Sequence, residues 1–195
     1  TIRMRSLIKN EMETARIIHN MAKLLRSSLT WTKDRVTVQE ELEFIHCFLE
    51  IQQYRFGERL TYRLEVDPAA REVVIPKMVF LPFVENASIH GIEPMKEGGE
   101  IDIAIRLGFN YLEFSIRDNG VGMQPEQVAR FYGYLKDEAV ELGERIGVQN
   151  VIYRLKMLYG DEFRLLIDSA PRKGTYIRIT LPLRNESADS VEPLS

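Results

Sequence analysis

An acidic residue followed by two glycines is the first place in this chain where residue types and spacing suggest chemistry. Residues 112–117 alternate apolar and polar side chains, as a strand does, and lead directly into Asp118, Gly120 and Gly122. A carboxylate at a strand end can accept a hydrogen bond from an exocyclic amine, and backbone N–H groups beside it can face phosphate. The same residues also form ordinary hairpin turns. Nucleotide contact and plain turn are therefore both open from this segment alone.

Three other groups of residues could complete such a site. Asn86 and His90 lie four residues apart in a helical pattern and so share one face. Gly147 stands at a helix start, which is a natural phosphate site, and a glycine also opens the last strand. With the turn, the candidates are Glu85, Asn86, His90, Gly91, Asp118, Gly120, Gly122, Gly147, Asn150, Gly174 and Thr175. Each group alone is a weak signal, but all four in this order point to one shared site.

The bulk composition narrows the class of protein. A length of 195 residues suits one domain with an appended element, or two small domains. Hydrophobic residues at 45% and charged residues at 28% are ordinary for a soluble globular protein. The net charge of −3 argues against nucleic-acid binding, and a single cysteine, Cys47, indicates a reducing compartment.

The chain ends and apolar runs carry further expectations. No apolar run approaches the roughly 20 residues that a membrane span needs, and residues 1–10 lack the apolar core of a signal peptide. Because the chain does not begin with methionine, we expect it to be a fragment of a longer protein.

Two helical patterns occupy the N-terminal part. The first runs over residues 2–29 with an apolar seam. The second begins at a capping box formed by Thr37 and Glu40 and ends at Gly57. Such a helical hairpin has too little core to be stable alone. It can bury its seams on the rest of the chain, or pair with a second copy as a four-helix bundle; we expect a homodimer through residues 1–57.

Beyond Gly57 the pattern changes to short strands and helices. Alternation predicts strands at residues 60–66, 73–75, 101–107, 111–117, 164–168 and 176–183, and helical spacing predicts helices at 77–90 and 147–159. Residues 124–144 are loosely patterned, with a short helix at 125–135, and such segments are often mobile and functional. We predict an α+β fold, a helical hairpin (1–57) followed by a two-layer α/β sandwich with a mixed sheet (58–184). Residues 185–195 are expected to form a disordered tail.

The order of these motifs closely resembles the ATP-binding domain of sensor histidine kinases. That domain belongs to a wider group with gyrase, heat-shock chaperone ATPases, mismatch-repair ATPases and anti-sigma kinases. The segments that look like the branch of autolysin-regulating sensors are 24–29, 38–42, 54–60, 82–87 and 154–160. The likeness covers nearly the whole chain, up to about Pro182.

The resemblance implies ATP and Mg²⁺ as cofactors. Asp118 would accept a hydrogen bond from the adenine amino group, Asn86 would coordinate Mg²⁺, and Glu85 would activate the attacking group as a general base. The other implied positions are Gly120 and Gly122 beside the base, Gly174 and Thr175 on the adenine side, His90 and Gly91 near the phosphates, and Gly147 and Asn150 at the phosphate-facing helix start. Residues 124–144 would be the lid over ATP.

Two departures from the family pattern stand out. Arg145 occupies a position that is usually glycine, and Gly143 could supply the flexibility instead. The family's phospho-accepting histidine lies in an Asn-Pro-His-Phe motif before the first helix, and that motif does not occur in this sequence. We expect it upstream of Thr1. His19 and His46 are interpreted as helix-surface or bundle residues.

The implied function is a kinase that transfers the γ-phosphoryl group of ATP to a histidine upstream of this fragment. An aspartate on a response-regulator receiver domain would then receive it. The fragment should bind ATP without phosphorylating itself, as the cytoplasmic part of a parent held in the cell membrane only by upstream segments. An ATPase or anti-sigma serine kinase with the same pocket is an alternative, against which the hairpin argues. A second alternative is a degenerate nucleotide-binding signalling scaffold, and Arg145 is the only residue that favours it.

Overall fold

The structure is a computed structural model, and it describes residues 11–29, 34–136 and 147–183. Its helices are α2 (Met12–Leu29), α3 (Val38–Phe56), α4 (Leu81–Glu85), the π-helix η3 (Asn86–Ile92), α5 (Pro125–Leu135) and α6 (Val148–Tyr159). Within these described ranges, no helix combines the length and apolar character needed to cross a membrane. The predicted tail and the start of the first predicted helix lie outside the described residues.

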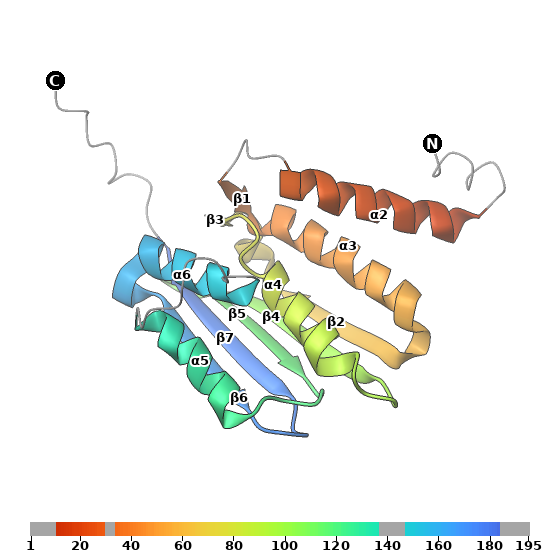
Figure 1. The fold of residues 1–195 in the computed structure, drawn as a ribbon. Coiled ribbons are helices and arrows are strands. Elements are labelled where there is room, and N and C mark those ends of the chain that lie inside the picture. Colours follow the sequence, from red (N-terminus) through yellow and green to blue (C-terminus); the bar gives the residue numbers. More distant parts are fainter. Residues whose placement is uncertain (1–10, 30–33, 137–146, 184–195) are drawn as a thin grey trace.

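A five-stranded sheet forms one layer of the molecule. Its strands are β2 (Leu60–Val66), β4 (Gly99–Leu107), β5 (Tyr111–Asp118), β6 (Arg164–Ser169) and β7 (Thr175–Pro182), in the order β2-β4-β5-β7-β6. The β2–β4 pair is parallel and the other pairs are antiparallel. Helices α3, α4 and α6 lie over one face (Figure 1). The expected fold class, a two-layer sandwich with a mixed sheet, is confirmed.

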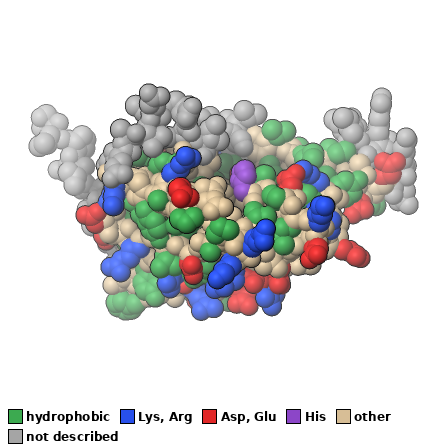
Figure 2. All heavy atoms as spheres, turned by 60° about the horizontal axis from the view of Figure 1, so that its bottom comes forward, with side chains coloured by type: hydrophobic (Ala, Val, Ile, Leu, Met, Phe, Trp, Pro, Cys, Tyr) green, Lys and Arg blue, Asp and Glu red, His purple; other side chains and the backbone are tan. Residues whose placement is uncertain are grey.

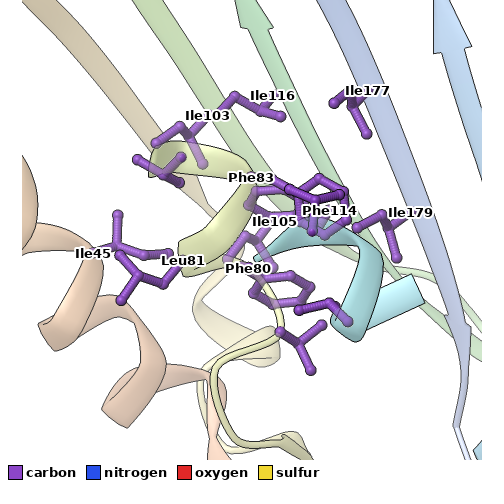
Figure 3. Close-up of a cluster of buried hydrophobic side chains, with 14 of the residues drawn as sticks. Ile45, Phe80, Leu81, Phe83, Ile103, Ile105, Phe114, Ile116, Ile177 and Ile179 are labelled. Carbon is purple, nitrogen blue, oxygen red and sulfur yellow. The ribbon is translucent and has the colours of Figure 1, made fainter. Parts of the chain in front are cut away.

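The core lies between this sheet and the helices. Alternate residues of β4, β5 and β7 point toward the helices and are almost fully buried, namely Ile101, Ile103, Ile105, Leu112, Phe114, Ile116, Ile177, Ile179 and Leu181. The Phe114 ring stacks on Phe80 with ring centroids 4.3 Å apart, and Phe83 packs beside them at a tilt (Figure 3). This aromatic contact fixes the start of α4 against the centre of the sheet.

Helix α3 begins and ends where the sequence predicts. The Thr37 side chain accepts the backbone N–H of Glu40 and the Glu40 side chain accepts that of Thr37, which completes the capping box. Gly57, with φ 59°, ends the helix. The apolar seam of α3 packs into the same core as the sheet and α4. Of the two ways to bury a seam, this helix therefore uses the rest of its own chain.

The sequence predicts residues 73–75 as a strand of the mixed sheet, but they do not join the main sheet. They form β3 (Val74–Pro76), which pairs antiparallel with β1 (Arg35–Thr37). The first free N–H groups of α3 supply the reason, because Val38 and Gln39 donate to the carbonyls of Val73 and Arg71. The segment is thereby held beside the start of α3. Alternation identifies a strand but not its partner.

The helix predicted at 77–90 begins later and changes type. Helix α4 starts only at Leu81, and from Asn86 the chain follows a π-helix in which Glu93 N–H donates to Ser88 C=O at 2.9 Å. Insertions of this kind are frequent at functional sites. The wider turn carries the chain on past His90 to Gly91 and Ile92, which are buried.

The sheet face away from the helices carries charges of both signs. Arg63 on β2 pairs with Asp102 on β4 at 2.7 Å, and Arg178 on β7 lies 3.7 Å from Glu113 on β5. Figure 2 shows basic and acidic side chains interspersed on the side of the molecule that is turned forward there. Exposed pairs of this kind contribute little to stability, so the helix-covered face supplies most of the folding free energy.

Truncation of Phe114 tests this description of the core. Phe114 is fully buried and stacked, so we expect Phe114→Ala to lower the free energy of unfolding by about 3–5 kcal/mol. Phe109 is 95% exposed, and Phe109→Ala should change it by less than about 0.5 kcal/mol. Urea unfolding of both variants measures the difference. Equal losses would contradict the arrangement of the core.

Candidate functional site

A cavity of about 420 Å³ lies where β5 and β7 meet η3 and α5. The described residues that line it are Asn86, His90, Gly91, Asp118, Val121, Gly122, Met123, Gln127, Phe131 and Thr175. Six of the candidates from the sequence, Asn86, His90, Gly91, Asp118, Gly122 and Thr175, are thus brought to one cavity. Residues more than eighty positions apart in the chain form this site.

Asp118 is the buried acid of the cavity. It ends β5 opposite Thr175 of β7, its side chain is 5% exposed, and its Oδ1 accepts the N–H of Gly120 at 2.9 Å. Burial raises the pKa of Asp118 to about 6, although backbone N–H groups of Gly120 and Thr175 act in the opposite direction. The site therefore holds a carboxylate with few partners of its own, which can accept a donor from a ligand.

Two glycines let the π-helix touch the turn after Asp118. A Cβ on Gly91 would lie 2.9 Å from Asp118 Oδ1, and one on Gly120 would lie 2.3 Å from the carbonyl oxygen of Gly91. That carbonyl accepts the N–H of Val121 at 3.0 Å. Any side chain at either glycine would push η3 away from Asp118.

Gly122 and Gly174 are needed for a different reason. Their φ angles are +68° and +73°, where L side chains are strained. The space is also filled, because a Cβ on Gly122 would lie 2.0 Å from the carbonyl oxygen of Ala170, and one on Gly174 would lie 2.0 Å from that of Asp118. These two glycines bring the 119–122 turn and the 170–174 turn together.

Ser169 is a site residue that the sequence analysis missed. Its Oγ accepts the N–H of Met123 at 2.9 Å and donates to the carbonyl of Gly174 at 2.9 Å. It also lies 3.0 Å from Thr175 Oγ1. In the sequence, Ser169 only marks the end of a strand, and no pattern indicates that its hydroxyl joins three segments around the cavity.

Helix α5 closes one side of the cavity with Gln127 and Phe131, which are four residues apart on one face. Tyr132 fastens this helix to the edge strand β6, since its hydroxyl accepts the N–H of Ile167 at 2.9 Å and donates to the Ile167 carbonyl at 3.3 Å. The helix expected at 125–135 is confirmed. The rest of the expected lid, with Gly143 and Arg145, lies outside the described residues.

The remaining candidates lie off this cavity. Glu85 is half-buried, and burial raises the pKa of its carboxyl group. Gly147, with φ +67°, precedes α6, and a Cβ there would meet no atom of the described residues within 4 Å. Asn150, in the first turn of α6, is exposed. The described lining of the cavity therefore includes the buried acid, two of the candidate glycines and Asn86, and does not include the helix start at Gly147.

The donors for a metal ion are few. Among the described residues, no cluster of three or more His, Cys, Asp or Glu side chains could hold one. Asn86 lines the cavity. An amide oxygen is a suitable ligand for Mg²⁺, which commonly takes few protein ligands and completes its shell with phosphate oxygens and water. His19 and His46 are exposed on the hairpin, away from this lining.

Comparison with known families identifies the class of protein. The family described as "Histidine kinase-, DNA gyrase B-, and HSP90-like ATPase" matches residues 73–185. This match spans more than half of the chain, so the chain belongs to that family of ATPases. Within it the chain falls in the sensor histidine kinase branch, because the family described as "Histidine kinase" matches residues 1–60.

Individual relatives agree with this assignment. The chain is 32% identical over 176 residues to the sensor histidine kinase YesM of Bacillus subtilis. The matched region covers 90% of this chain and 29% of YesM. The chain is 35% identical over 159 residues to the sensor histidine kinase YpdA of Escherichia coli, covering 80% of this chain and 27% of YpdA. The chain therefore spans less than a third of the length of these curated relatives.

Solved structures share the fold. The histidine kinase domain of the blue-light activated kinase EL346 of Erythrobacter litoralis superimposes with a TM-score of 0.53 at 14% identity, over 88% of this chain and 75% of that one. A nucleotide-free catalytic domain of the histidine kinase ThkA gives 0.54 at 15% identity, over 76% of this chain and 94% of that one. At these identities the likeness concerns the fold alone.

Alanine substitutions at Gly147 and Gly174 distinguish the cost of backbone strain from the cost of steric overlap. Gly147→Ala adds a side chain at positive φ in open space, so we expect it to cost about 1–2 kcal/mol of stability. Gly174→Ala adds the same strain and a 2.0 Å contact with the Asp118 carbonyl, and should cost at least about 2 kcal/mol more. Urea unfolding compares the two. A smaller loss for Gly174→Ala would be inconsistent with the close approach of the two turns.

Replacement of Asp118 by asparagine should stabilise the protein at high pH. Asp118 has an ordinary pKa of 3.8 and a folded pKa of about 6. The folded state thus binds this proton more tightly, and the stability it contributes is present below pH 3.8 and lost as pH rises through 6. We expect Asp118→Asn to exceed the wild type at pH 8 by about 1–3 kcal/mol, with the difference shrinking toward pH 4.

Unfolding in urea at pH 4.5 and pH 8 measures this effect. Asp168→Asn is the matched control, because Asp168 is an exposed aspartate on β6 and should show no such gain. A wild type more stable than Asp118→Asn at pH 8 would mean that the buried carboxylate is better compensated than its two backbone donors imply.

Proposed function

We propose that this chain binds Mg·ATP in the cavity at Asp118 and is the catalytic part of a protein histidine kinase. The observation that carries the proposal is the buried carboxylate of Asp118, held at a strand end by glycine turns beside a cavity of about 420 Å³. A buried acceptor with so few partners favours a ligand that donates hydrogen bonds, such as the adenine amino group.

The adenine end of the proposed site is formed by closely packed backbone segments. Asp118 accepts from the amino group, and Gly120, Gly122 and Gly174 keep the backbone close to where the base would lie. Thr175 supplies a buried hydroxyl on the adjoining strand. Such a preformed site limits the ordering cost of binding.

The phosphate end is proposed to involve η3 and the start of α6. Asn86 would hold Mg²⁺ through its amide oxygen, with His90 and Gly91 nearby. Mg²⁺, when bound, supplies positive charge that offsets the phosphate oxygens. Gly147 and Asn150 would meet the phosphates at the first turn of α6, a contact that needs this helix start and the cavity to approach each other.

Glu85 is the proposed general base. It directly precedes Asn86, and burial raises the pKa of its carboxyl group above the ordinary value, which makes the carboxylate a better proton acceptor. It would orient the acceptor imidazole and take up its proton, while phosphoryl transfer itself depends mainly on positioning and charge. The acceptor histidine is proposed to lie upstream of Thr1, so the chain alone would bind ATP without phosphorylating itself.

The partners are part of the same proposal. A second copy would pair through the hairpin of residues 1–57, and the exposed apolar side chains Met12, Met21 and Leu25 on α2 support this. A response-regulator receiver domain would accept the phosphoryl group on an aspartate. The parent protein would be held in the cell membrane by segments outside this chain, with residues 58–184 as its ATP-binding domain in the cytoplasm. The histidine kinase match over residues 1–60 favours this function over an ATPase or a serine kinase.

Calorimetric titration with ATP tests the metal role of Asn86. We expect Asn86→Ala to weaken Mg·ATP binding about tenfold or more and to leave binding of ATP in excess chelator nearly unchanged, because only the metal-dependent part is lost. Equal weakening with and without Mg²⁺ would argue that Asn86 contacts the nucleotide itself. A wild type that binds no nucleotide at millimolar ATP would overturn the proposed function.

The pH dependence of binding tests Asp118. Because the carboxylate form accepts best, affinity should fall as pH drops through about 6, by about tenfold between pH 7 and pH 5. The nucleotide phosphates also titrate, and His90 lines the same cavity, so the pH profile is recorded again on Asp118→Asn, which changes neither. Asp118→Asn should bind weakly at pH 7 and lack the part of the profile centred near 6. Identical pH profiles for the wild type and Asp118→Asn would contradict the proposed role of Asp118.

Phosphorylation is tested on the chain extended upstream to the expected histidine motif. Labelled Mg·ATP should give acid-labile, alkali-stable label that is absent from Asp118→Asn and Asn86→Ala. The chain without the extension should bind ATP and stay unlabelled.

A further inference from the structure

A fully buried carboxylate on the hairpin holds the loop that leads into α4. Glu41 of α3 is 0% exposed and accepts three backbone N–H groups, from Met78 at 2.8 Å, Phe80 at 3.0 Å and Leu81 at 3.2 Å. These donors belong to the loop and to the first residue of α4. Hydrogen bonds to a buried carboxylate are among the stronger ones in proteins.

The same loop is held from the opposite direction by α6. The guanidinium of Arg154 donates to the carbonyl of Lys77 and to that of Met78, the latter at 3.3 Å. The loop also contains a strained residue, since Met78 has φ 55°. The N–H groups of the loop thus point to α3 and its carbonyl groups point to α6. In Figure 1 the start of α4 lies between these two helices.

The loop matters for the site because it leads through α4 into η3, which lines the cavity. Five residues after Leu81 the chain arrives at Asn86, and η3 then carries His90 and Gly91 along the cavity. Arg154 lies one turn beyond Asn150 on α6. Breaking the contacts of Glu41 would leave two buried N–H groups, one partly buried N–H group and a buried carboxyl group without these hydrogen bonds, which is costly. A displacement of α3 must therefore carry the start of α4 with it.

We propose that Glu41 and Arg154 are positioning residues that set α4 and η3 at the nucleotide cavity, and that through them the position of hairpin helix α3 controls nucleotide affinity. The proposal rests on the proposed function of the cavity. It deepens that function by naming the physical link between the hairpin and the site. By reciprocity, a bound nucleotide must also tighten the contact of the loop with α3.

The first test uses amide hydrogen exchange on the wild-type chain. ATP with Mg²⁺ should slow exchange at Met78, Phe80 and Leu81, whose N–H groups bind Glu41 and which do not line the cavity. Glu41→Gln should abolish this slowing and raise the Kd for ATP by at least about tenfold. Arg154→Lys should act in the same direction with a smaller effect, because one ammonium group replaces the fork of donors.

The controls are matched in helix and in chemistry. Glu43→Gln removes an exposed carboxylate of α3 that binds Lys23, and Lys156→Gln removes a partly buried cation of α6 that binds Asp161. Both should leave the Kd for ATP unchanged within twofold. Thermal unfolding of every variant is recorded beside the Kd, so that loss of folded protein is separated from loss of affinity.

The outcomes distinguish this proposal from the proposed function. If Glu41→Gln is folded and binds ATP as tightly as the wild type, the positioning role is overturned while ATP binding stands. If Glu41→Gln does not fold, the positioning role is still tested by Arg154→Lys and by the nucleotide-dependent exchange of the wild-type loop. If ATP does not slow exchange at these amides, the proposal is overturned. If the wild type binds no ATP, the proposed function fails and this inference fails with it.

Discussion

The constraint on which the site depends is the close approach of three backbone segments around the carboxylate of Asp118. The π-helix meets it through Gly91, its own turn folds back through Gly120, and the carbonyl of Asp118 lies against Gly174. Each contact leaves less room than a single Cβ needs. Because the segments come from distant parts of the chain, the cavity can exist only when η3, β5 and the start of β7 are all in place.

Those segments are held by one core. Stacking of Phe80 on Phe114 anchors the start of α4 on β5, and pairing of β5 with β7 sets Asp118 opposite Thr175. Helix α3 packs into the same core and adds polar contacts through Glu41. The hairpin helix is therefore a structural part of the domain that carries the cavity, which gives a direct physical route between the two.

Much of this fold could be predicted from the sequence, and the exceptions share a cause. Alternation located β2 and the end of β5 at Asp118, and cap chemistry at Thr37 and Gly57 located α3. The pairing of β3 with β1, the π-helix at Asn86 and the role of Ser169 could not be read from the sequence. Each depends on which distant segment a residue meets, and periodicity identifies a face without its partner. Glu41 likewise looks like an ordinary first-turn acid of a helix until the loop at Met78 is seen against it.

The buried carboxylates show why the site is built this way. A protein selected only for stability would not bury Asp118 with two backbone donors, since burial raises its pKa and costs free energy at neutral pH. Burial raises the pKa of Glu41 as well, but Glu41 has three backbone donors against the two of Asp118, and Arg154 lies near it. The better-satisfied acid lies where the helices must be held, and the less satisfied one lies at the cavity. An acceptor left short of donors is what a ligand can complete, so this difference between the two acids supports the proposal of a ligand site at Asp118.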